Sequence, residues 1–323
     1  MLLVVLVPLL CAIVVCLIFF PVVIAKFKRV GITGKDLNKP GRPEVAEMGG
    51  LVIAAGFCAG ILLVIALKTY GGLFDGINLQ YLLATLATVL VVVLTGVLDD
   101  LISLRQWIKA ITPIFSAIPL IALKVGDTNI NIPFAGQVDI GIVFALILVP
   151  VGVTVAANGI NMLAGFNGLE VGMGLVGMIA LAFIAFHLGE NTALIILAAA
   201  IGALLATLRY NWYPARVFIG DSGTFGIGVI MASAVIIGNY EMAGVIIMIP
   251  HAIDFFIKAV NRLPSRGWEG LYRDGKLYCP SSRPKGFAQL VMKLTGGVSE
   301  KDLTLIFIGI EAIFSAFAIF LFL

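Results

Sequence analysis

The chain has 323 residues, of which 61% are apolar and only 12% charged, and its mean hydropathy is +1.11. A soluble domain carries about 25% charged residues, so this composition excludes a soluble globular protein and indicates a polytopic membrane protein. The formal net charge of +3 says little by itself, and we expect no nucleic-acid partner.

Ten segments have the roughly 20 apolar residues that a membrane-spanning helix needs. In chain order they are 1–25, 49–69, 79–98, 107–125, 140–160, 168–188, 191–208, 222–238, 241–259 and 303–323. The first has no basic flank before it and no short apolar core, so we expect a spanning helix and not a cleaved signal. The sequence therefore predicts an all-α, polytopic integral membrane protein in which residues 1–323 form one domain.

Strict alternation of these spans places five connections on one side of the membrane, namely 26–48, 99–106, 161–167, 209–221 and 260–302. With the adjoining helix ends they hold 19 of the 21 Lys and Arg residues, and only Lys68 and Lys124 fall on the other side. Because basic residues accumulate on the cytoplasmic side, we predict that these connections are cytoplasmic and that both termini lie outside.

The longest outer connection begins at Gly126 and reads GDTNINIPFAGQVDIG. Polar and apolar residues alternate in its first half, and a turn through Pro133 and Gly136 follows. This pattern predicts a small extracytoplasmic β-hairpin.

Two adjacent carboxylates, Asp99 and Asp100, close the third predicted span, and Arg105 and Lys109 follow them. Charges at the edge of a membrane segment are costly unless they face water or bind a ligand. The pair is therefore either a hydrated helix end or part of a catalytic site, and the residues alone leave both interpretations open.

The segment NGINMLAGFNGLE (158–170) joins the fifth and sixth predicted spans on the same side. Asn158 and Asn161 are three residues apart, so they share one face of a helix. The glycines would let a ligand approach the backbone closely. A helix-packing motif of small residues is the alternative interpretation.

Asp221 and Ser222 come at the start of the eighth predicted span. Free N–H groups at the start of a helix favour anions such as phosphate. The alternative is that one of the two residues only caps the helix.

Together these clusters suggest a site for phosphoryl transfer. Mg²⁺ prefers one or two carboxylates, with phosphate and water as its other ligands. Asp99, Asp100 and Asp221 would supply such carboxylates, and Asn161 a neutral oxygen. The basic residues Lys109 and Arg262 would neutralise a pyrophosphate beside the ion.

Four motifs follow one another at the cytoplasmic connections: GKDLNKPGRPEVAEMGG (34–50), GVLDDLISLRQWIK (96–109), NGINMLAGFNGLE (158–170) and RYNWYPARVFIGDSG (209–223). In these motifs, and over nearly its whole length, the chain resembles the polyprenyl-phosphate N-acetylhexosamine-1-phosphate transferase superfamily, glycosyltransferase family 4. The pieces NGLE and YNWYPARVFIGD are most similar to the archaeal and eukaryotic UDP-GlcNAc:dolichyl-phosphate GlcNAc-1-phosphotransferases.

This resemblance implies that GlcNAc-1-phosphate passes from UDP-GlcNAc to a polyprenyl phosphate, in the first place dolichyl phosphate, with release of UMP. The product, polyprenyl-PP-GlcNAc, would begin lipid-linked oligosaccharide synthesis for N-glycosylation. The implied cofactor is Mg²⁺, with Mn²⁺ as an alternative. The active site would face the cytoplasm from an integral membrane protein, which would lie in the cell membrane if the source is prokaryotic or archaeal. The implied partners are the two substrates and membrane lipids, and a homodimer is left open.

Matched residue by residue, the resemblance implies metal ligands at Asn161 and Asp221. Asn167 would recognise uracil, and Gly168 and Leu169 would line the same pocket. Lys109 would contact pyrophosphate, and Arg262 would contact pyrophosphate or sugar phosphate. Further substrate contacts are expected at Asn158, Glu170 and Ser222.

Asp99 and Asp100 match paired aspartates that act either as a general base or by positioning the metal and the lysine. A phosphate monoester has its second pKa at about 6, so the lipid phosphate is already largely dianionic at neutral pH. The chemistry therefore does not require a carboxylate base.

The last large cytoplasmic loop departs from the family pattern. Bacterial relatives usually carry a histidine-rich motif there, and the eukaryotic pattern is Arg-His-Arg-Leu-Pro, whereas this chain reads VNRLPSRGWEG (260–270). Arg262 takes the place of the second arginine, and Val260 and Asn261 replace the other two residues.

Two alternatives remain. One is the same chemistry with another UDP-sugar or with undecaprenyl phosphate, which would make a cell-wall precursor. The other, from a different class, is a lipid or sugar transporter, which would use charges inside the membrane such as Glu311. Asp254 would either face the cleft of an active site or pair with a basic residue.

Overall fold

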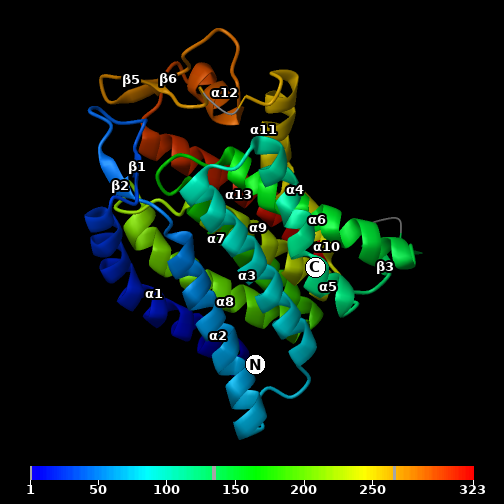
Figure 1. Cartoon of the computed structure of the whole chain (residues 1–323). Helices are drawn as coiled ribbons and strands as arrows, with labels where there is room; N and C mark the ends of the chain where they lie inside the picture. Colours follow the sequence, from blue (N-terminus) through cyan, green and yellow to red (C-terminus); the bar gives the residue numbers. More distant parts are fainter. Residues whose placement is uncertain (1, 133–135, 265–266) are drawn as a thin grey trace.

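The computed structural model describes residues 2–132, 136–264 and 267–323, and helices make up most of it (Figure 1). The long helices are α1 (Leu2–Val30), α2 (Gly50–Gly71), α3 (Leu79–Ile102), α6 (Val149–Leu163), α7 (Leu169–Leu188), α8 (Asn191–Asn211), α9 (Gly220–Ile237) and α13 (Glu300–Phe322). The shorter ones are α4 (Gln106–Ser116), α5 (Ile118–Ala122), the π-helical turn η1 (Phe144–Leu148), α10 (Glu241–Ile247), α11 (Ile249–Val260) and α12 (Phe287–Leu294).

Three small antiparallel hairpins complete the described part of the fold. They pair β1 (Thr33–Lys35) with β2 (Glu44–Ala46), β3 (Asn129–Ile132) with β4 (Gly136–Asp139), and β5 (Leu271–Arg273) with β6 (Lys276–Tyr278). The second of these confirms the hairpin predicted from the sequence, with Ile130 opposite Val138. Pro133, the predicted turn residue, lies outside the described residues.

The described residues contain eight helices that are long and apolar enough to cross a membrane. These are α1, α2, α3, the η1–α6 unit, α7, α8, α9 and α13. α10 and α11 add a ninth span if they are counted as one segment, which bends by 56°. Pro250 stands in the first turn of α11, and because proline has no backbone N–H, the helical hydrogen-bond ladder is interrupted there.

The stretch Gln106–Ala122, which holds α4 and α5, is apolar but shorter than a usual span. The helices follow the ten predicted segments in order, so the prediction of an all-α polytopic membrane protein is confirmed. That this stretch crosses the membrane as a tenth span, and that both termini lie outside, stay predictions.

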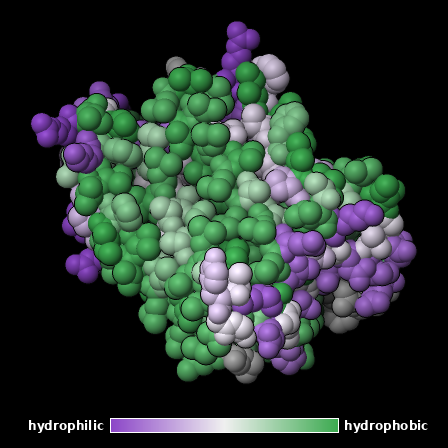
Figure 2. Space-filling model, turned by 60° about the horizontal axis from the view of Figure 1, so that its bottom comes forward, coloured by the Kyte–Doolittle hydropathy of each residue, from purple (hydrophilic) through white to green (hydrophobic). Residues whose placement is uncertain are grey.

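The outer surface of the helices is apolar. Figure 2 shows a continuous hydrophobic face, with hydrophilic residues gathered near its margins. On α1, for example, the side chains of Leu10, Ile18 and Val22 are all more than half exposed. An apolar surface of this extent is typical of a protein surrounded by lipid.

α9 occupies the centre of the helical bundle, and 89% of its most apolar stretch is buried. Small residues let its neighbours come close: a Cβ added to Gly96 of α3 would lie 2.4 Å from Ser222, and one added to Gly228 of α9 would lie 2.4 Å from the carbonyl oxygen of Ala156 in α6. Close contact at small residues is how membrane helices gain packing energy, since lipid provides no hydrophobic driving force between them.

The hairpins β1–β2 and β5–β6 and helix α12 lie together at one end of the bundle, at the top of Figure 1. The β1–β2 segment is joined to the start of α9, because the backbone N–H of Phe218 donates to the carbonyl of Ala46 and the N–H of Gly49 donates to that of Phe218, both at 2.8 Å. The polar motifs recognised in the sequence therefore converge on this end.

Candidate active site

A cavity of about 1260 Å³ extends along α6 and the bent pair α10–α11. α9 contributes both Asp221, in its first turn, and Ile236, near its end, so the cavity extends about 22 Å along that helix. Around Asp221 the wall carries polar side chains, whereas Phe144 and Val245 belong to a long apolar wall. The shape suits a ligand with a charged head and an apolar tail.

Lys109 joins two carboxylates at the polar end of the cavity. Its ammonium lies 2.8 Å from Oδ2 of Asp99 and also pairs with Oδ2 of Asp221. Asp99 in addition accepts a hydrogen bond from the backbone N–H of Leu104 at 2.6 Å, so it fixes the turn between α3 and α4. Asp99 therefore positions Lys109 both directly and through the turn that starts α4.

Asp100 has a different set of partners. Its Oδ1 accepts the backbone N–H of Asp221 at 2.9 Å, and its Oδ2 accepts the Ser222 hydroxyl at 3.1 Å. An acceptor placed on the free N–H groups of a first turn is a helix cap, here supplied by α3 to α9.

Gly220 makes this cap possible. A Cβ on Gly220 would lie 2.6 Å from the Asp100 carboxylate, and its φ of +65° is one that residues with side chains rarely adopt. The glycine of the IGDSG sequence is thus required by the close approach of Asp100.

Asn161 and Asp221 meet directly: the Asn161 amide lies 2.5 Å from Oδ1 of Asp221 and 2.8 Å from the Thr224 hydroxyl. Within the described residues, no group of three or more His, Cys, Asp or Glu side chains could hold a metal ion. One carboxylate and one carboxamide nevertheless fit Mg²⁺, which usually takes one or two carboxylates and completes its shell with phosphate and water. Turning the amide would present its oxygen to an ion beside Asp221.

The structure separates the predicted site residues into two groups. Five of them line the cavity: Lys109, Asn158, Asn161, Glu170 and Asp221. The other seven lie outside its described wall: Asp99, Asp100, Asn167, Gly168, Leu169, Ser222 and Arg262. Asp99 and Asp100 contact the cavity residues from behind, as described above.

Asn158 and Glu170 remain candidates for substrate contact. The Asn158 amide donates to the carbonyls of Ala110 and Thr154, at 3.0 and 2.9 Å, and so ties α6 to α4. Glu170 is 7% exposed, and its Oε2 has no hydrogen-bond partner among the described residues. A ligand donor in the cavity would satisfy that oxygen.

Three predicted substrate contacts, Ser222, Leu169 and Arg262, lie outside the described wall of the cavity, and their contacts with substrate stay predictions. Ser222 is fully buried and its hydroxyl donates to the Asp100 carboxylate, so it does not itself cap α9, whose N-cap residue is Ile219. Leu169 is 1% exposed and packs in an apolar cluster with Phe166 and Met173. Arg262 is exposed beside the cavity-lining residues Leu263 and Pro264.

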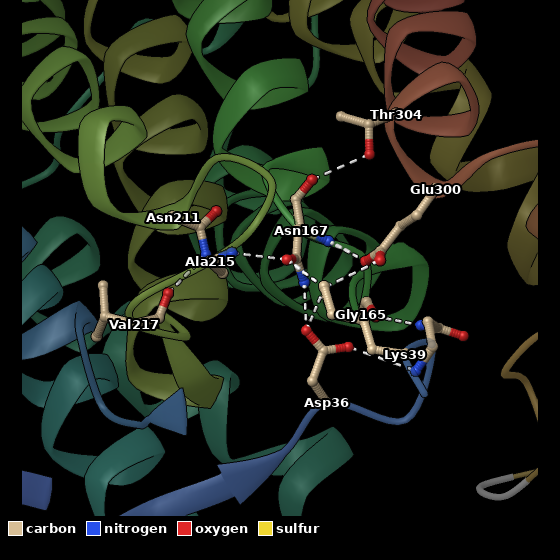
Figure 3. Close-up of polar contacts among 10 residues, drawn as sticks. Asp36, Lys39, Gly165, Asn167, Asn211, Ala215, Val217, Glu300 and Thr304 are labelled. Carbon is tan, nitrogen blue, oxygen red and sulfur yellow. Dashed lines mark hydrogen bonds and ion pairs between the residues drawn. The ribbon is translucent and has the colours of Figure 1, made fainter. Parts of the chain in front are cut away.

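Asn167 is held in a buried polar cluster (Figure 3). Its Oδ1 accepts hydrogen bonds from the Lys39 ammonium at 2.6 Å and the backbone N–H of Ala215 at 2.7 Å. Its Nδ2 donates to Asp36 at 3.1 Å, and its backbone N–H donates to Glu300 at 2.8 Å. Gly168 follows it with a φ of +77°. Recognition of uracil by Asn167 stays a prediction. The Asn167 amide would have to bind uracil while it keeps its hydrogen bonds to Lys39, Asp36 and Ala215.

Glu47 was not predicted as a site residue, although it lies within the motif 34–50. Glu47 lines the cavity near Gly34, and burial together with the neighbouring Asp100 raises its pKa above the usual 4.5. Nothing in the sequence distinguishes it from Glu44 three residues earlier, so its position in the fold is the only signal.

The two interpretations of Asp254 are also resolved. Its carboxylate pairs with Lys258 at 2.8 Å and accepts the backbone N–H of Phe287, the first residue of α12, at 2.7 Å. Lys258 in turn donates to the carbonyl of Met162 near the end of α6. Asp254 is thus the partner of a basic residue, and the pair attaches α12 to α6 and α11.

The model of glycosyl transferase family 4 matches residues 82–239 of this chain. A protein of Saccharolobus solfataricus, provisionally named a UDP-N-acetylglucosamine–dolichyl-phosphate N-acetylglucosaminephosphotransferase, is 36% identical over 93% of this chain and 91% of its own length. A Sulfolobus acidocaldarius protein with the same provisional name is 37% identical over 95% of this chain and 92% of its own length. A Dictyostelium discoideum protein that bears this name without qualification is 28% identical over 70% of this chain and 64% of its own length.

Proposed function

Because this chain belongs to glycosyl transferase family 4, we propose that it transfers GlcNAc-1-phosphate from UDP-GlcNAc to a polyprenyl phosphate, dolichyl phosphate in the first place. The observation that carries this proposal is the meeting of Lys109, Asn161 and Asp221 at the polar end of a long apolar cavity. The products would be UMP and polyprenyl-PP-GlcNAc, the start of lipid-linked oligosaccharide synthesis for N-glycosylation.

In this proposal Asp221 and Asn161 hold Mg²⁺, or Mn²⁺ in its place. The bound ion would supply neutralisation of the pyrophosphate charge. Lys109 adds a second positive charge at the same place, and Asp99 keeps its ammonium in position through their 2.8 Å contact. Asp100 fixes the first turn of α9 and therefore the direction of the Asp221 side chain.

The acceptor binds with its prenyl chain along the apolar wall and its phosphate towards Asp221. An oxygen of the lipid phosphate attacks the β-phosphorus of UDP-GlcNAc. A new P–O bond forms, the bond to the bridging oxygen breaks, and UMP leaves with that electron pair. The phosphate is already largely dianionic above its second pKa of about 6, so no side chain has to remove a proton.

The proposal places the active site on the cytoplasmic face. Of the 21 Lys and Arg residues, 19 belong to the connections assigned to that side or to the adjoining helix ends. The β1–β2 segment, which hydrogen-bonds to the start of α9 beside Asp221, belongs to one of these connections. The nucleotide donor would thus arrive from the cytoplasm and the acceptor from the bilayer.

The deciding experiment supplies the purified chain with UDP-GlcNAc, Mg²⁺ and a short dolichyl phosphate, and measures UMP release. We expect release that stops with a chelator and returns with Mg²⁺ or Mn²⁺. UMP release that needs neither dolichyl nor undecaprenyl phosphate would overturn the proposal. A phosphosugar bound covalently to the enzyme in the absence of acceptor would overturn the single displacement.

The same assay separates the closest alternative, transfer from another UDP-sugar or to undecaprenyl phosphate, because each donor and acceptor can be varied in turn. The transporter alternative has less support. Its intramembrane candidate, Glu311, is 1% exposed and lies outside the described wall of the cavity.

A further inference from the structure

A buried ionic cluster lies at the polar end of the cavity, and its member Asp36 is one of the lining residues. It contains Asp36, Lys39 and Glu300, whose side chains are only 3%, 11% and 3% exposed. The Lys39 ammonium pairs with Asp36, lies 3.0 Å from Oε2 of Glu300 and sits over the ring of Tyr213, 4.7 Å from its centre. One buried ammonium thus faces two buried carboxylates.

The cluster joins four segments that are far apart in the sequence, and they meet at Asn167 (Figure 3). Lys39 and Asp36 come from the loop between β1 and β2, and Ala215 from the loop between α8 and α9. Glu300 and Thr304 come from the first turns of α13, and Thr304 donates to the carbonyl of Asn167 at 3.0 Å. Lys39 is the cluster's single cation in the described structure.

The same loops form the rim of the cavity. Asp36 and Leu37 line it, as does Gly165, two residues before Asn167. Asn38 joins these loops to a third: its amide donates to the carbonyl of Gly165 at 3.2 Å, and its oxygen accepts the backbone N–H of Gly270 at 3.1 Å. The third loop carries Trp268, which packs against the bare Cα of Gly165.

The cluster can act on the rim because Lys39 supplies its one positive charge against the two carboxylates of Asp36 and Glu300. If the ammonium is removed, Asp36 and Glu300 repel one another in a place where water cannot screen them. The two loops that they anchor would then move apart, and with them Leu37 and Gly165. Asp221 and Lys109 would be unaffected, because they are held separately by Asp99 and Asp100.

We propose that Lys39 is a positioning residue: with Asp36, Asn167 and Glu300 it holds the cavity rim in the shape that binds the nucleotide part of the donor. This rests on the proposed transfer from a UDP-sugar. Asn167 then contributes by holding the loop of Lys39 and Asp36, while Asn38 of that loop holds Gly165.

The test compares Lys39→Met and Glu300→Gln with the matched control Lys301→Met, an exposed lysine next to Glu300. In the assay described above, we expect KM for UDP-GlcNAc to rise about tenfold or more in both cluster variants. Turnover at saturating donor and KM for dolichyl phosphate should stay within about twofold of wild type. The control should match wild type in all three.

Two outcomes would overturn the proposal. One is an unchanged KM for UDP-GlcNAc in both cluster variants. The other is a fall in turnover with KM unchanged, which is what partial unfolding alone would produce. When Lys39→Met and Glu300→Gln are combined, KM for UDP-GlcNAc should rise by less than the product of the two separate fold-changes, because each substitution breaks the same cluster.

Should Lys39→Met fail to fold, Thr304→Val gives a milder version, because it removes one neutral hydrogen bond to Asn167. UMP binding, measured by calorimetry, should weaken in that variant and in Glu300→Gln, and unchanged binding in both would contradict the proposal. UMP release by the wild-type protein tests the proposed function by itself. The role of Lys39 is tested separately, by the ratio of KM for UDP-GlcNAc in each variant to that of the wild type.

Discussion

The carboxylate of Asp100 accepts the backbone N–H of Asp221 at 2.9 Å, so one aspartate holds the turn on which another stands. Asp99, its neighbour in the sequence, instead holds Lys109 at 2.8 Å. Two adjacent residues thus position Lys109 and Asp221, two of the charged groups that line the cavity. A pair that looks like one catalytic unit in the sequence divides into two separate supports.

Asp100→Asn should weaken metal binding more than it slows the chemical step. The amide keeps one acceptor for the α9 cap but loses the charge at the helix start. Groups that orient a metal ligand typically change affinity or activity about 10- to 100-fold. We expect the Mg²⁺ concentration for half-maximal UMP release to rise in this range. Lost turnover with an unchanged Mg²⁺ titration would instead indicate a general base.

Gly220→Ala should damage both stability and activity. The added Cβ would lie 2.6 Å from Asp100, and a φ of +65° costs about 1–3 kcal/mol for a residue with a side chain. Gly226→Ala, in the same helix, is the control, because its Cβ would make an ordinary 3.4 Å contact with Val93. Thermal unfolding and UMP release are the measurements, and equal results for the two variants would contradict the cap.

Because of Glu47, the free energy of unfolding should fall as pH rises. Burial and Asp100 raise its pKa in the folded chain above the usual 4.5, so the folded state holds a proton that the unfolded chain has already lost. The resulting stabilisation is complete below pH 4.5 and is lost as pH rises through the folded-state pKa. Glu47→Gln should remove this dependence. The measurement is the unfolding temperature of the wild type and of Glu47→Gln from acid to neutral pH. The same pH dependence in both proteins would refute the prediction.

Asp254→Asn should loosen α12. The substitution leaves the buried Lys258 without its anionic partner, and breaking a buried ion pair costs about 3–5 kcal/mol. We expect a lower unfolding temperature and faster proteolysis between α11 and α12. Asp274→Asn, in the exposed turn between β5 and β6, is the control and should behave like wild type, since asparagine tolerates its positive φ.

Hydropathy and charge were enough to predict the helical class and the order of the apolar segments, because lipid imposes both directly. The segment 168–188, for example, corresponds to α7, Leu169–Leu188. Hydropathy did not foresee the break between α10 and α11 or the short α4 and α5. The prolines were visible in the sequence, at Pro250 and Pro119, but whether proline ends or bends a helix depends on its neighbours.

The site was predictable in its location and less so in its details. Asn161, Asp221 and Lys109 meet as the motifs indicated, because each motif marks one end of a helix at the same side. The partners of Asn167 come from positions 36, 39, 215, 300 and 304, and no local pattern reveals such contacts. Resemblance supplied a role for each residue, whereas only the fold indicates which of them reach the cavity.

The apolar wall that begins beside Asp221 has a practical consequence for work with the purified protein. Single-chain detergents share the outline of the expected acceptor, a polar head on a hydrocarbon tail, so they would enter the same cavity of about 1260 Å³. Extraction would therefore add a competitive inhibitor. Lipid nanodiscs should give a lower apparent KM for the acceptor than micelles do, and amphiphiles with anionic heads are a starting point for inhibitors.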